Sequence, residues 1–404
     1  MTTTPWIEIH PKPEFYLFVP RDEKGLERYH AFPKVTEIFP LYGVGMTTAS
    51  DNYDIDFDQN VLVNRIRLFK HNPGSDDELH LLFQIREKKG WSIRRAWQML
   101  QSVSDSELKR LTVPVLYRPF DVRWIFYHDS VVWRTVKRVM LHMLAGENLA
   151  LIIPRRVEHI GDWHHAFVSK SISEHVAVSL KTTDYHCPLY IYPDPERGNL
   201  FSAIEPQERQ PNLNPELFNA LGEAYGQQPA PEQVFHYIYA VLYAPSYRER
   251  YSDFLRLDFP RIPFSAKREV FEALADLGRR LVALHLLESP ELDPPLAHFE
   301  GEGDNRVAKN KRDGFYYEAD RDRVYTNKSQ YFAPVPIEAW KYPIGGYQVC
   351  GKWLKDRRGR QLSLDEIRTY CRIVTALART MELQEEIDEL YSRVEGDLLG
   401  GVST

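Results

Sequence analysis

The spacing of hydrophobic positions changes along the first half of the chain from helical to strand-like. From Val61 to about Lys109, apolar residues such as Leu62, Ile66 and Phe69 recur at helical intervals, with breaks at HNPGSDD and KKGW. This predicts a helical insertion over about 61–110. Short apolar runs typical of strands follow at TVPVLY, VRWIFYH, NLALIIP and HAFVSK. Two more such runs are EFYLFVP (14–20) and CPLYIYP (187–193). A helix is expected across VKRVMLHMLAG, where a glycine ends the pattern.

The second half of the chain is mainly helical in pattern. Asn214 followed by Pro215 is a typical helix start, and Ser363 begins a capping box that opens a long helix to about Arg393. Helices are predicted at about 215–225, 231–243, 246–257 and 265–288. The region 290–360 is rich in loops, with short strands at RVYTN and QYFAPV. The stretch from YPDPERGNL to QERQPNLNP has no periodicity and many turn residues, which predicts a linker.

These elements predict an α/β (α+β) chain of two lobes. The first lobe, 1–200, combines a mixed sheet with the helical insertion. The second lobe, 201–404, is helix-rich and carries a loop region at 305–360 and the long C-terminal helix. A chain of 404 residues is long enough for more than one hydrophobic core.

Composition narrows the class of protein. With 43% hydrophobic and 27% charged residues the chain resembles ordinary soluble proteins, and no apolar run reaches the length of a membrane helix. The start, MTTTPWIEIHPKPEF, lacks the pattern of a signal peptide. Cys187, Cys350 and Cys371 are odd in number and far apart, which argues against a disulfide framework or a zinc knuckle. We therefore expect a cytoplasmic protein.

The distribution of charge changes the interpretation of the net charge. The chain carries −6 overall, which by itself disfavours a nucleic-acid partner. From Arg306 to Arg360, however, thirteen Lys and Arg residues face six acids, so this segment carries +7. Phosphates respond to a local patch rather than to the whole-chain charge. The segment predicts either a DNA-binding surface or a solvated basic surface.

Four segments contain residue types found in catalytic or metal sites. ELDPPLAHFEGEGDN is similar to two motifs of amino-methyltransferases, but Leu296 cannot stack on an extruded base and Pro294-Pro295 ends the preceding helix. In HIGDWHHAF, adjacent His164 and His165 would point to opposite faces of a strand. The motif IREKKG lacks the upstream aspartate of a nuclease. DNYDIDFDQN, expected to form a strand or ordered loop with its acids outward, lacks the glycine and final glutamate of a calcium loop.

We therefore expect neither a catalytic centre nor a bound metal in this chain. No nucleophile elbow, phosphate loop or HExxH motif is present in the sequence. An alternative stays open in which EGEGDN, or the group of His159, Asp162, His164 and His165, is catalytic. The chain would then be an S-adenosylmethionine-dependent enzyme in its own right.

Four basic segments carry contact chemistry instead. Arg and Lys bind phosphates and base edges, and Thr hydroxyls bind phosphates. The candidate DNA-binding residues are Arg134, Lys137 and Arg138 beside Trp133; Arg155 and Arg156; Lys181, Thr182 and Thr183; and Lys352, Lys355, Arg357 and Arg358 around Trp353. Arg155 and Arg156 leave a strand end and are the candidate base readers, unless they pair with Glu158 and Asp162. The run GKWLKDRRGR is flanked by glycines and is expected to be a flexible phosphate-binding segment.

The segment LYRPFDVRWIFYH combines aromatic rings with charged side chains. Trp124, Phe126 and His128 fall on one face of a strand, with Ile125 and Tyr127 on the other. We expect a buried central strand that supports the DNA-facing loop 129–138. Its Asp121 is expected to pair with Arg118 or Arg123.

Segments from both halves occur together in one ordered series. They are LYRPFDVRWIFYH, VMLHMLAGENLALIIPRR, HAFVSKSISEH, PLYIYP, PNLNPELF, FHYIYAVLYAPSYRERYSDFLRLDFPRIP, GRRLVALHLLE, EGEGDNRV, NKSQYF and IGGYQVCGKWLKDRRGR. From about Pro13 to Asp388 the chain resembles the C-terminal target-recognition region of Type ISP restriction-modification enzymes. Those are single-chain proteins that join nuclease, translocase, amino-methyltransferase and DNA-specificity parts.

The resemblance implies sequence-specific recognition of double-stranded DNA for adenine methylation. S-adenosylmethionine and ATP would then bind to methyltransferase and translocase domains or subunits, and no cofactor would bind to this chain. In the family the methyltransferase centre lies upstream of this region, and DPPL does not replace it. The chain is therefore expected to be a fragment of a longer enzyme or a specificity protein with a separate catalytic subunit. A third reading is a protein-interaction role, in which the acidic C-terminal helix docks a partner subunit.

Overall fold

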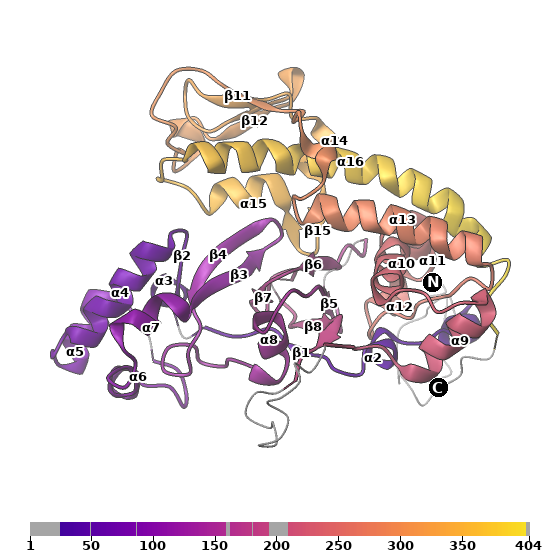
Figure 1. The fold of residues 1–404 in the computed structure, drawn as a ribbon. Helices are drawn as coiled ribbons and strands as arrows, with labels where there is room; N and C mark the ends of the chain where they lie inside the picture. Colours follow the sequence, from indigo (N-terminus) through magenta and orange to yellow (C-terminus); the bar gives the residue numbers. More distant parts are fainter. Residues whose placement is uncertain are drawn as a thin grey trace, which may run out of the picture.

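The computed structural model describes residues 25–48, 50–85, 87–158, 162–179, 181–193 and 209–400. The predicted strand at 14–20 and His159 lie outside these residues, and so does most of the predicted linker. The predicted lobe boundary near residue 200 also falls there and stays a prediction. Within the described part the chain is a mixed α/β structure, as expected, but its strands form several small sheets rather than one mixed sheet in the first half (Figure 1). None of the described helices is long and apolar enough to cross a membrane.

Among the described residues, three sheets of four strands form the larger β parts of the molecule. Their orders are β2-β4-β3-β7, β1-β8-β5-β6 and β11-β14-β13-β12, and all pairs are antiparallel except β3 with β7. The strands are β1 (Gly43–Val44), β2 (Ile55–Asp56), β3 (Thr112–Arg118), β4 (Asp121–Phe126), β5 (Ala150–Pro154), β6 (Phe167–Ser169), β7 (Ile172–Ser173), β8 (Asp184–Pro188), β11 (His298–Glu300), β12 (Tyr316–Glu318), β13 (Arg323–Tyr325) and β14 (Tyr331–Ala333). Two further pairs join β9 (Tyr190–Ile191) to β10 (Gln210–Pro211) and β15 (Pro343–Ile344) to β16 (Tyr347–Gln348).

The described helices include those predicted from the sequence, in the predicted order, and also α1, α2, α3, α14 and α15, which were not predicted. They are α1 (Leu26–His30), α2 (Val35–Ile38), α3 (Asp51–Asp54), α4 (Gln59–His71), α5 (Asp76–Phe83), α6 (Ile93–Leu100), α7 (Asp105–Arg110), α8 (Lys137–Leu144), α9 (Pro215–Tyr225), α10 (Pro231–Tyr243), α11 (Pro245–Arg250), α12 (Ser252–Leu255), α13 (Arg268–His285), α14 (Ile337–Lys341), α15 (Val349–Lys355) and α16 (Leu364–Val394). Of the short 3-10 helices, η2 (Pro290–Leu292) lies between α13 and β11, η3 (Lys311–Asp313) between β11 and β12, and η4 (Ala319–Arg321) between β12 and β13. The helix predicted at 246–257 is instead two short helices that meet at Tyr251.

The segment predicted as a helical insertion contains α4–α7, which project from the first sheet (Figure 1). Local side chains fix the helix starts. The Asp58 carboxylate accepts hydrogen bonds from the backbone N–H groups of Asn60 and Val61 in the first turn of α4, and Ser75 forms a capping box with Glu78. The insertion buries its own cluster of apolar side chains, which includes Phe69 and Leu100, against one face of the first sheet.

Strand β4 confirms the predicted division of its faces, but it is less buried than expected. Phe126 joins the core of the insertion, whereas Ile125 packs into a separate cluster on the opposite face. Trp124 is half-buried, and Val122, on the same face as Trp124, is 55% exposed. The strand is central in the order β2-β4-β3-β7, but its beginning extends beyond the insertion that covers its end.

We expect Trp124→Ala to lower the free energy of unfolding by about 2 kcal/mol, roughly half the cost of truncating a fully buried tryptophan. The half-buried ring packs against the core of the insertion, so its loss exposes that core. Urea unfolding measures the change. Val122→Ala, on the exposed part of the same face, is the matched control and should stay within about 0.5 kcal/mol of the wild type. A mutant of unchanged stability that had lost DNA binding would contradict a supporting role for this strand.

The sequence prediction for the acidic segment DNYDIDFDQN is partly wrong. Residues Asp51–Asp54 form one helical turn, and the strand is limited to Ile55–Asp56. The Asp54 side chain is fully buried rather than outward, and its Oδ2 accepts a hydrogen bond from the backbone N–H of Ser50 at 3.1 Å.

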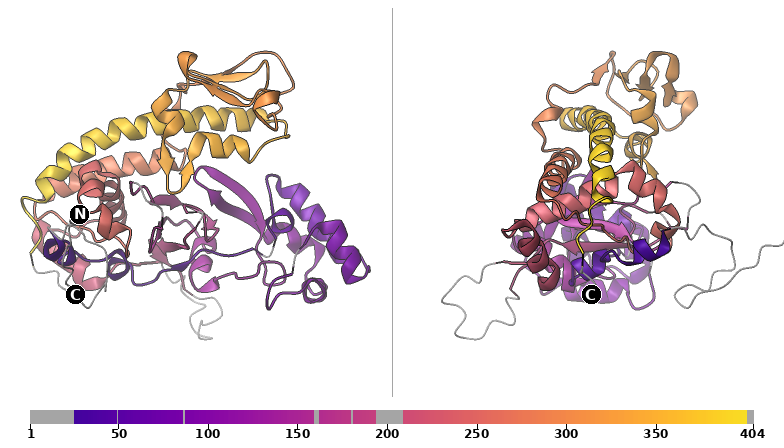
Figure 2. Two further views of the ribbon diagram at one scale, coloured as in Figure 1. Left: turned by 180° about the vertical axis from the view of Figure 1, so that it is seen from behind. Right: turned by 90° about the vertical axis from the view of Figure 1, so that its right-hand side faces the viewer.

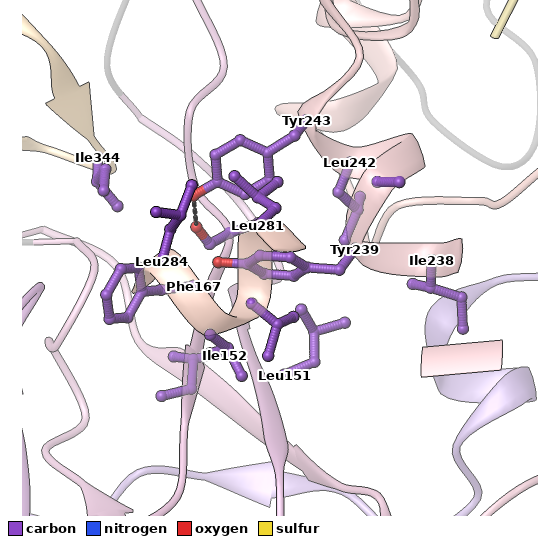
Figure 3. Close-up of a cluster of buried hydrophobic side chains, with 14 of the residues drawn as sticks. Leu151, Ile152, Phe167, Ile238, Tyr239, Leu242, Tyr243, Leu281, Leu284 and Ile344 are labelled. Atoms are coloured by element: carbon purple, nitrogen blue, oxygen red, sulfur yellow. Dashed lines mark hydrogen bonds between the residues drawn. The ribbon is translucent and has the colours of Figure 1, made fainter. Parts of the chain in front are cut away.

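The largest core lies between the second sheet and the helices of the C-terminal half. Ile152 of β5 and Phe167 of β6 face Tyr239 of α10 and Leu281 of α13 (Figure 3). The Tyr243 hydroxyl donates to the carbonyl of Ala166 at 2.8 Å, so the polar ends of the rings are also satisfied. Side chains from both sides of the predicted boundary therefore share one continuous core.

Helix α16 runs along the molecule and contacts both the C-terminal helices and the third sheet (Figure 2). It packs against α13, α11 and α14, and the third sheet lies on its first half through Phe332 and Tyr370, whose ring centroids are 4.3 Å apart. The predicted capping box at Ser363 is present at its start. Because α16 has 31 residues, it is about 46 Å long.

Candidate nucleic-acid interface

Exposed cations from two loops lie around Trp133, which belongs to the loop after β4. Its indole N–H donates to the carbonyl of Lys89 at 3.1 Å. The Lys88 ammonium lies 5.2 Å from the centre of the indole ring, and the Arg134 guanidinium lies 4.6 Å from it. Backbone pairing of Arg134 with Thr47 holds the loop in place. We call Lys88, Lys89, Trp133 and Arg134 the tryptophan cluster.

The sequence placed Arg134 in this region but missed both lysines. Lys88 and Lys89 appeared only in the rejected nuclease motif IREKKG, 44 residues before Trp133. Both side chains are exposed. The signal that could have found them is their position in a glycine-containing turn, where exposed lysines are common, but only the fold shows which loop they face.

At the start of α8 the two predicted cations differ in their surroundings. Lys137 forms an ion pair with Asp129, which leaves it partly neutralised. Arg138 is exposed and forms no ion pair with any described residue. Arg138 is therefore the more available of the two for a phosphate.

The two candidate base readers at the end of β5, Arg155 and Arg156, also differ in their ion pairs. The Nε of Arg155 lies 2.9 Å from Oδ1 of Asp258. The other carboxylate oxygen of Asp258, Oδ2, lies 2.9 Å from the Lys34 ammonium. Burial alone would raise the pKa of Asp258, but Lys34 and Arg155 hold it below its usual range. The acid partner of Arg155 is thus Asp258, not Glu158 or Asp162. Arg156 is exposed and makes no ion pair within the described part of the chain.

The predicted loop before β8 is supported by a buried carboxyl group. Lys181 and Thr183 are exposed, while the Thr182 hydroxyl donates to the Ser179 hydroxyl at 2.8 Å. The Asp184 side chain accepts hydrogen bonds from the backbone N–H groups of Val178 at 2.6 Å and Ser179 at 3.2 Å. Burial raises the pKa of Asp184 well above its usual range. This carboxyl therefore fixes the base of the loop and does not add charge to its surface.

The run GKWLKDRRGR is ordered rather than flexible, which corrects the sequence prediction. Residues Val349–Lys355 form α15. Gly351 lies inside the helix at a close approach, because a Cβ there would overlap the side-chain amide of Gln348 and lie 3.3 Å from the Trp340 ring. Lys352 forms an ion pair with Asp356, Lys355 is exposed, and Arg358 is exposed with its guanidinium 5.0 Å from the centre of the Phe315 ring.

Arg357 does not belong to this surface. Its side chain is 5% exposed, its Nη2 lies 2.9 Å from Oδ1 of Asp121, and its Nε lies 3.1 Å from Oε1 of Glu366. The guanidinium also lies 3.4 Å from the centre of the Trp353 ring. Position i+4 from Trp353 faces the same side of the helical turn, so both side chains point inward. The sequence analysis included Arg357 among the surface cations because a count of basic residues does not show which side of a helical turn each side chain lies on.

A second group of cations forms where two distant segments pair. The N–H of Val307 donates to the carbonyl of Arg360 at 2.9 Å, and the N–H of Gly359 donates to the carbonyl of Val307 at 2.7 Å. The pairing places the loop after Val307 beside the turn that follows α15. We call the exposed cations of these segments the C-terminal basic cluster: Lys309, Lys311, Arg312, Lys355 and Arg358.

Among the described residues, the two segments considered as catalytic alternatives, EGEGDN and the segment that carries His164, have separate surroundings. EGEGDN connects β11 to the paired segment at Val307, and Leu296 precedes β11 instead of following a strand. His164 Nδ1 lies 3.1 Å from Nη1 of Arg248, and burial together with Arg248 lowers the pKa of His164 to about 3. In the described ranges no three His, Cys, Asp or Glu side chains are grouped as metal ligands.

Comparisons with known proteins agree with the resemblance predicted from the sequence. No curated protein matches the chain. A nuclease-deletion mutant of the Type ISP restriction-modification enzyme LlaGI, in complex with a DNA substrate mimic, matches with a TM-score of 0.64 and 18% identity, over 95% of this chain and 30% of that one. The DrdV–DNA complex matches with a TM-score of 0.70 and 21% identity, over 95% and 40%. The ATP-dependent Type ISP enzyme LlaBIII bound to DNA matches with a TM-score of 0.65 and 17% identity, over 94% and 25%.

The chain therefore spans well under half the length of each of these proteins and shares their fold over this part. The family model for the Type ISP C-terminal specificity domain matches residues 37–386, which is most of the chain. The protein belongs to the family of Type ISP C-terminal specificity domains.

Proposed function

We propose that this chain recognises a specific sequence in double-stranded DNA as the specificity module of a Type ISP-like restriction-modification system. The observation that carries the proposal is the family match over residues 37–386. It is supported by the DNA-bound state of three proteins that share the fold. The module would place DNA for adenine methylation or cleavage by methyltransferase and translocase domains or subunits. Those partners would bind S-adenosylmethionine and ATP.

The surface of this chain fits such a role. The tryptophan cluster, Arg138, the loop at Lys181 and the C-terminal basic cluster expose cations on loops and helix ends, with phosphate-binding chemistry. Arg156 follows β5, whose residues are all buried, so it stands on a rigid support. A base reader needs such a support, because bidentate hydrogen bonds tolerate little displacement.

Selection of duplexes from a random library tests the proposal directly. The chain is immobilised, bound duplexes are recovered and amplified, and the recovered pool is sequenced after several rounds. Enrichment of one defined sequence is the expected result. Recovery of DNA without any shared sequence would leave only a general affinity for phosphate and would overturn the proposal. Calorimetry with S-adenosylmethionine alone would reveal a methyltransferase site of the chain's own.

We expect Arg156→Ala to weaken binding to the selected duplex by about 1–3 kcal/mol and to change binding to a scrambled duplex little. The reason is that a base reader contributes only where its base is present. Lys355→Ala is the matched variant for a phosphate contact and should weaken both duplexes about equally. Competition titrations with the two duplexes measure the difference. Equal loss on both duplexes, or no loss, for Arg156→Ala would remove this residue from the readers.

A further inference from the structure

Rings and guanidinium groups alternate along the seam between the first sheet and α15. The Arg118 and Arg123 guanidinium carbons lie 4.0 and 3.8 Å from the centre of the Tyr117 ring. Arg123 also lies 4.2 Å from the centre of the Phe57 ring, and Arg360 lies 3.6 Å from it. We call these five residues the arginine ladder. It connects β3 and β4 of the N-terminal half to the turn after α15.

Phe57 is the point where the two halves of the ladder meet. Besides Arg123 and Arg360, the Arg357 guanidinium lies 4.7 Å from the Phe57 ring centre. One uncharged ring therefore contacts one guanidinium from β4 and two from the segment after α15. Three guanidinium groups therefore lie around the half-buried side chain of Phe57. A cation near an aromatic face is attracted by its quadrupole, and the attraction is stronger when solvent is excluded.

Carboxylates hold the same guanidinium groups from the other side. Asp121, which is 1% exposed, lies 2.6 Å from Nη2 of Arg123 and 2.9 Å from Nη2 of Arg357. Asp356 lies 3.2 Å from Nη2 of Arg123, and Glu366 lies 3.2 Å from Nη1 of Arg360. Each cation of the central part is thus held by a ring and an acid, which fixes both its position and its orientation.

The ladder connects the supports of the two exposed basic groups. Strand β4 leads into the loop that carries Trp133 and Arg134, and its six residues span roughly 20 Å. The segment after α15 carries Arg358 and pairs with the loop of Lys309. The tryptophan cluster and the C-terminal basic cluster therefore belong to two rigid supports, and the ladder sets the position of one support relative to the other.

We propose that Phe57 and its guanidinium partners are positioning residues for DNA discrimination. The ladder keeps the two basic groups at a fixed separation, so that one duplex in the correct register is contacted by both. Discrimination between sequences needs side chains held near their productive geometry, whereas general attraction to phosphate does not. This inference rests on the proposed function and assigns a role to a residue that need not touch DNA.

Phe57→Ala tests the proposal because it removes the ring and leaves every charge in place. We expect affinity for the selected duplex to fall about ten-fold, the size of the loss of one base contact, because the two basic groups are no longer held at the separation that this duplex requires. Affinity for a scrambled duplex and the salt dependence should stay unchanged. Phe57→Tyr keeps the ring and should restore discrimination. Circular dichroism and thermal unfolding monitor the fold, and Phe57→Leu replaces Phe57→Ala if the latter does not fold.

Phe254→Ala is the matched control. Its ring is also half-buried and stacks on Tyr29 at 5.2 Å, but it lies in the C-terminal helices away from the ladder. This variant should lose stability and keep the wild-type ratio of affinities. A folded Phe57→Ala protein with the wild-type ratio, or with equal loss on both duplexes, would overturn the proposal. A wild-type protein that fails to discriminate between the duplexes would instead overturn the proposed function.

Discussion

Raising the salt concentration from 50 to 200 mM should lower the affinity of the chain for duplex DNA by about 10³, if roughly six phosphates are neutralised. The structure supplies enough cations for this number. Exposed cations without an ion pair to any described residue include Lys89, Arg138, Arg156, Lys181, Lys309 and Lys355. Binding would release the counterions condensed on the same number of phosphates, so the logarithm of the affinity should fall linearly with the logarithm of the salt concentration.

Fluorescence anisotropy with a labelled duplex at four or five salt concentrations measures this slope. Lys355→Ala should reduce the slope by about one, as for one lost phosphate contact. Lys267→Ala is the control, because Lys267 pairs with Asp397 near the opposite end of α16 and should leave the slope unchanged. An affinity independent of salt, or no binding at 50 mM, would contradict an electrostatic DNA interface on this chain.

Asp121→Ala should lower the free energy of unfolding by about 3–5 kcal/mol, the usual cost of removing one partner from a buried ion pair. The carboxylate is 1% exposed and binds both Arg123 and Arg357. Its removal leaves two largely buried guanidinium groups without their shared acid, although Asp356 and Glu366 still contact them. Urea unfolding at neutral pH measures the loss. Asp365→Ala, which removes a 90% exposed carboxylate paired with Arg368, should change stability by less than about 1 kcal/mol.

The same carboxylate predicts a pH dependence. Burial by itself would raise the pKa of Asp121, but Arg357 and Arg123 hold it below its usual range. A carboxyl group whose pKa is lowered by folding stabilises the fold above its unfolded pKa of about 3.9, and that stabilisation is lost as the pH falls through the folded pKa. The wild type should therefore lose stability below about pH 4, and Asp121→Ala should lack this part of the loss. Parallel acid profiles for the two proteins would refute the assignment.

Local features of the fold were predictable because their causes lie within one helical turn or one strand. Asn214 with Pro215 and the capping box at Ser363 start α9 and α16 where the sequence indicates. The opposite faces of β4 follow from its two-residue period, so the separation of Ile125 from Phe126 was correct as well. The ordered series of segments identified the family, which the match over residues 37–386 confirms.

Contacts between residues far apart in the chain decide which of the predicted cations are exposed on the basic surface. Arg155 binds Asp258, which is 103 residues away, and Arg357 binds Asp121, which is 236 residues away. Lys89 reaches Trp133 across 44 residues. The sequence by itself determined the family and the elements whose caps and periodicity are local, such as α9, α16 and the two faces of β4, but not α15 or the division of 246–257 into two helices. Which cations remain exposed was decided by the tertiary structure, because a guanidinium group is buried or free according to the partner that folding brings to it.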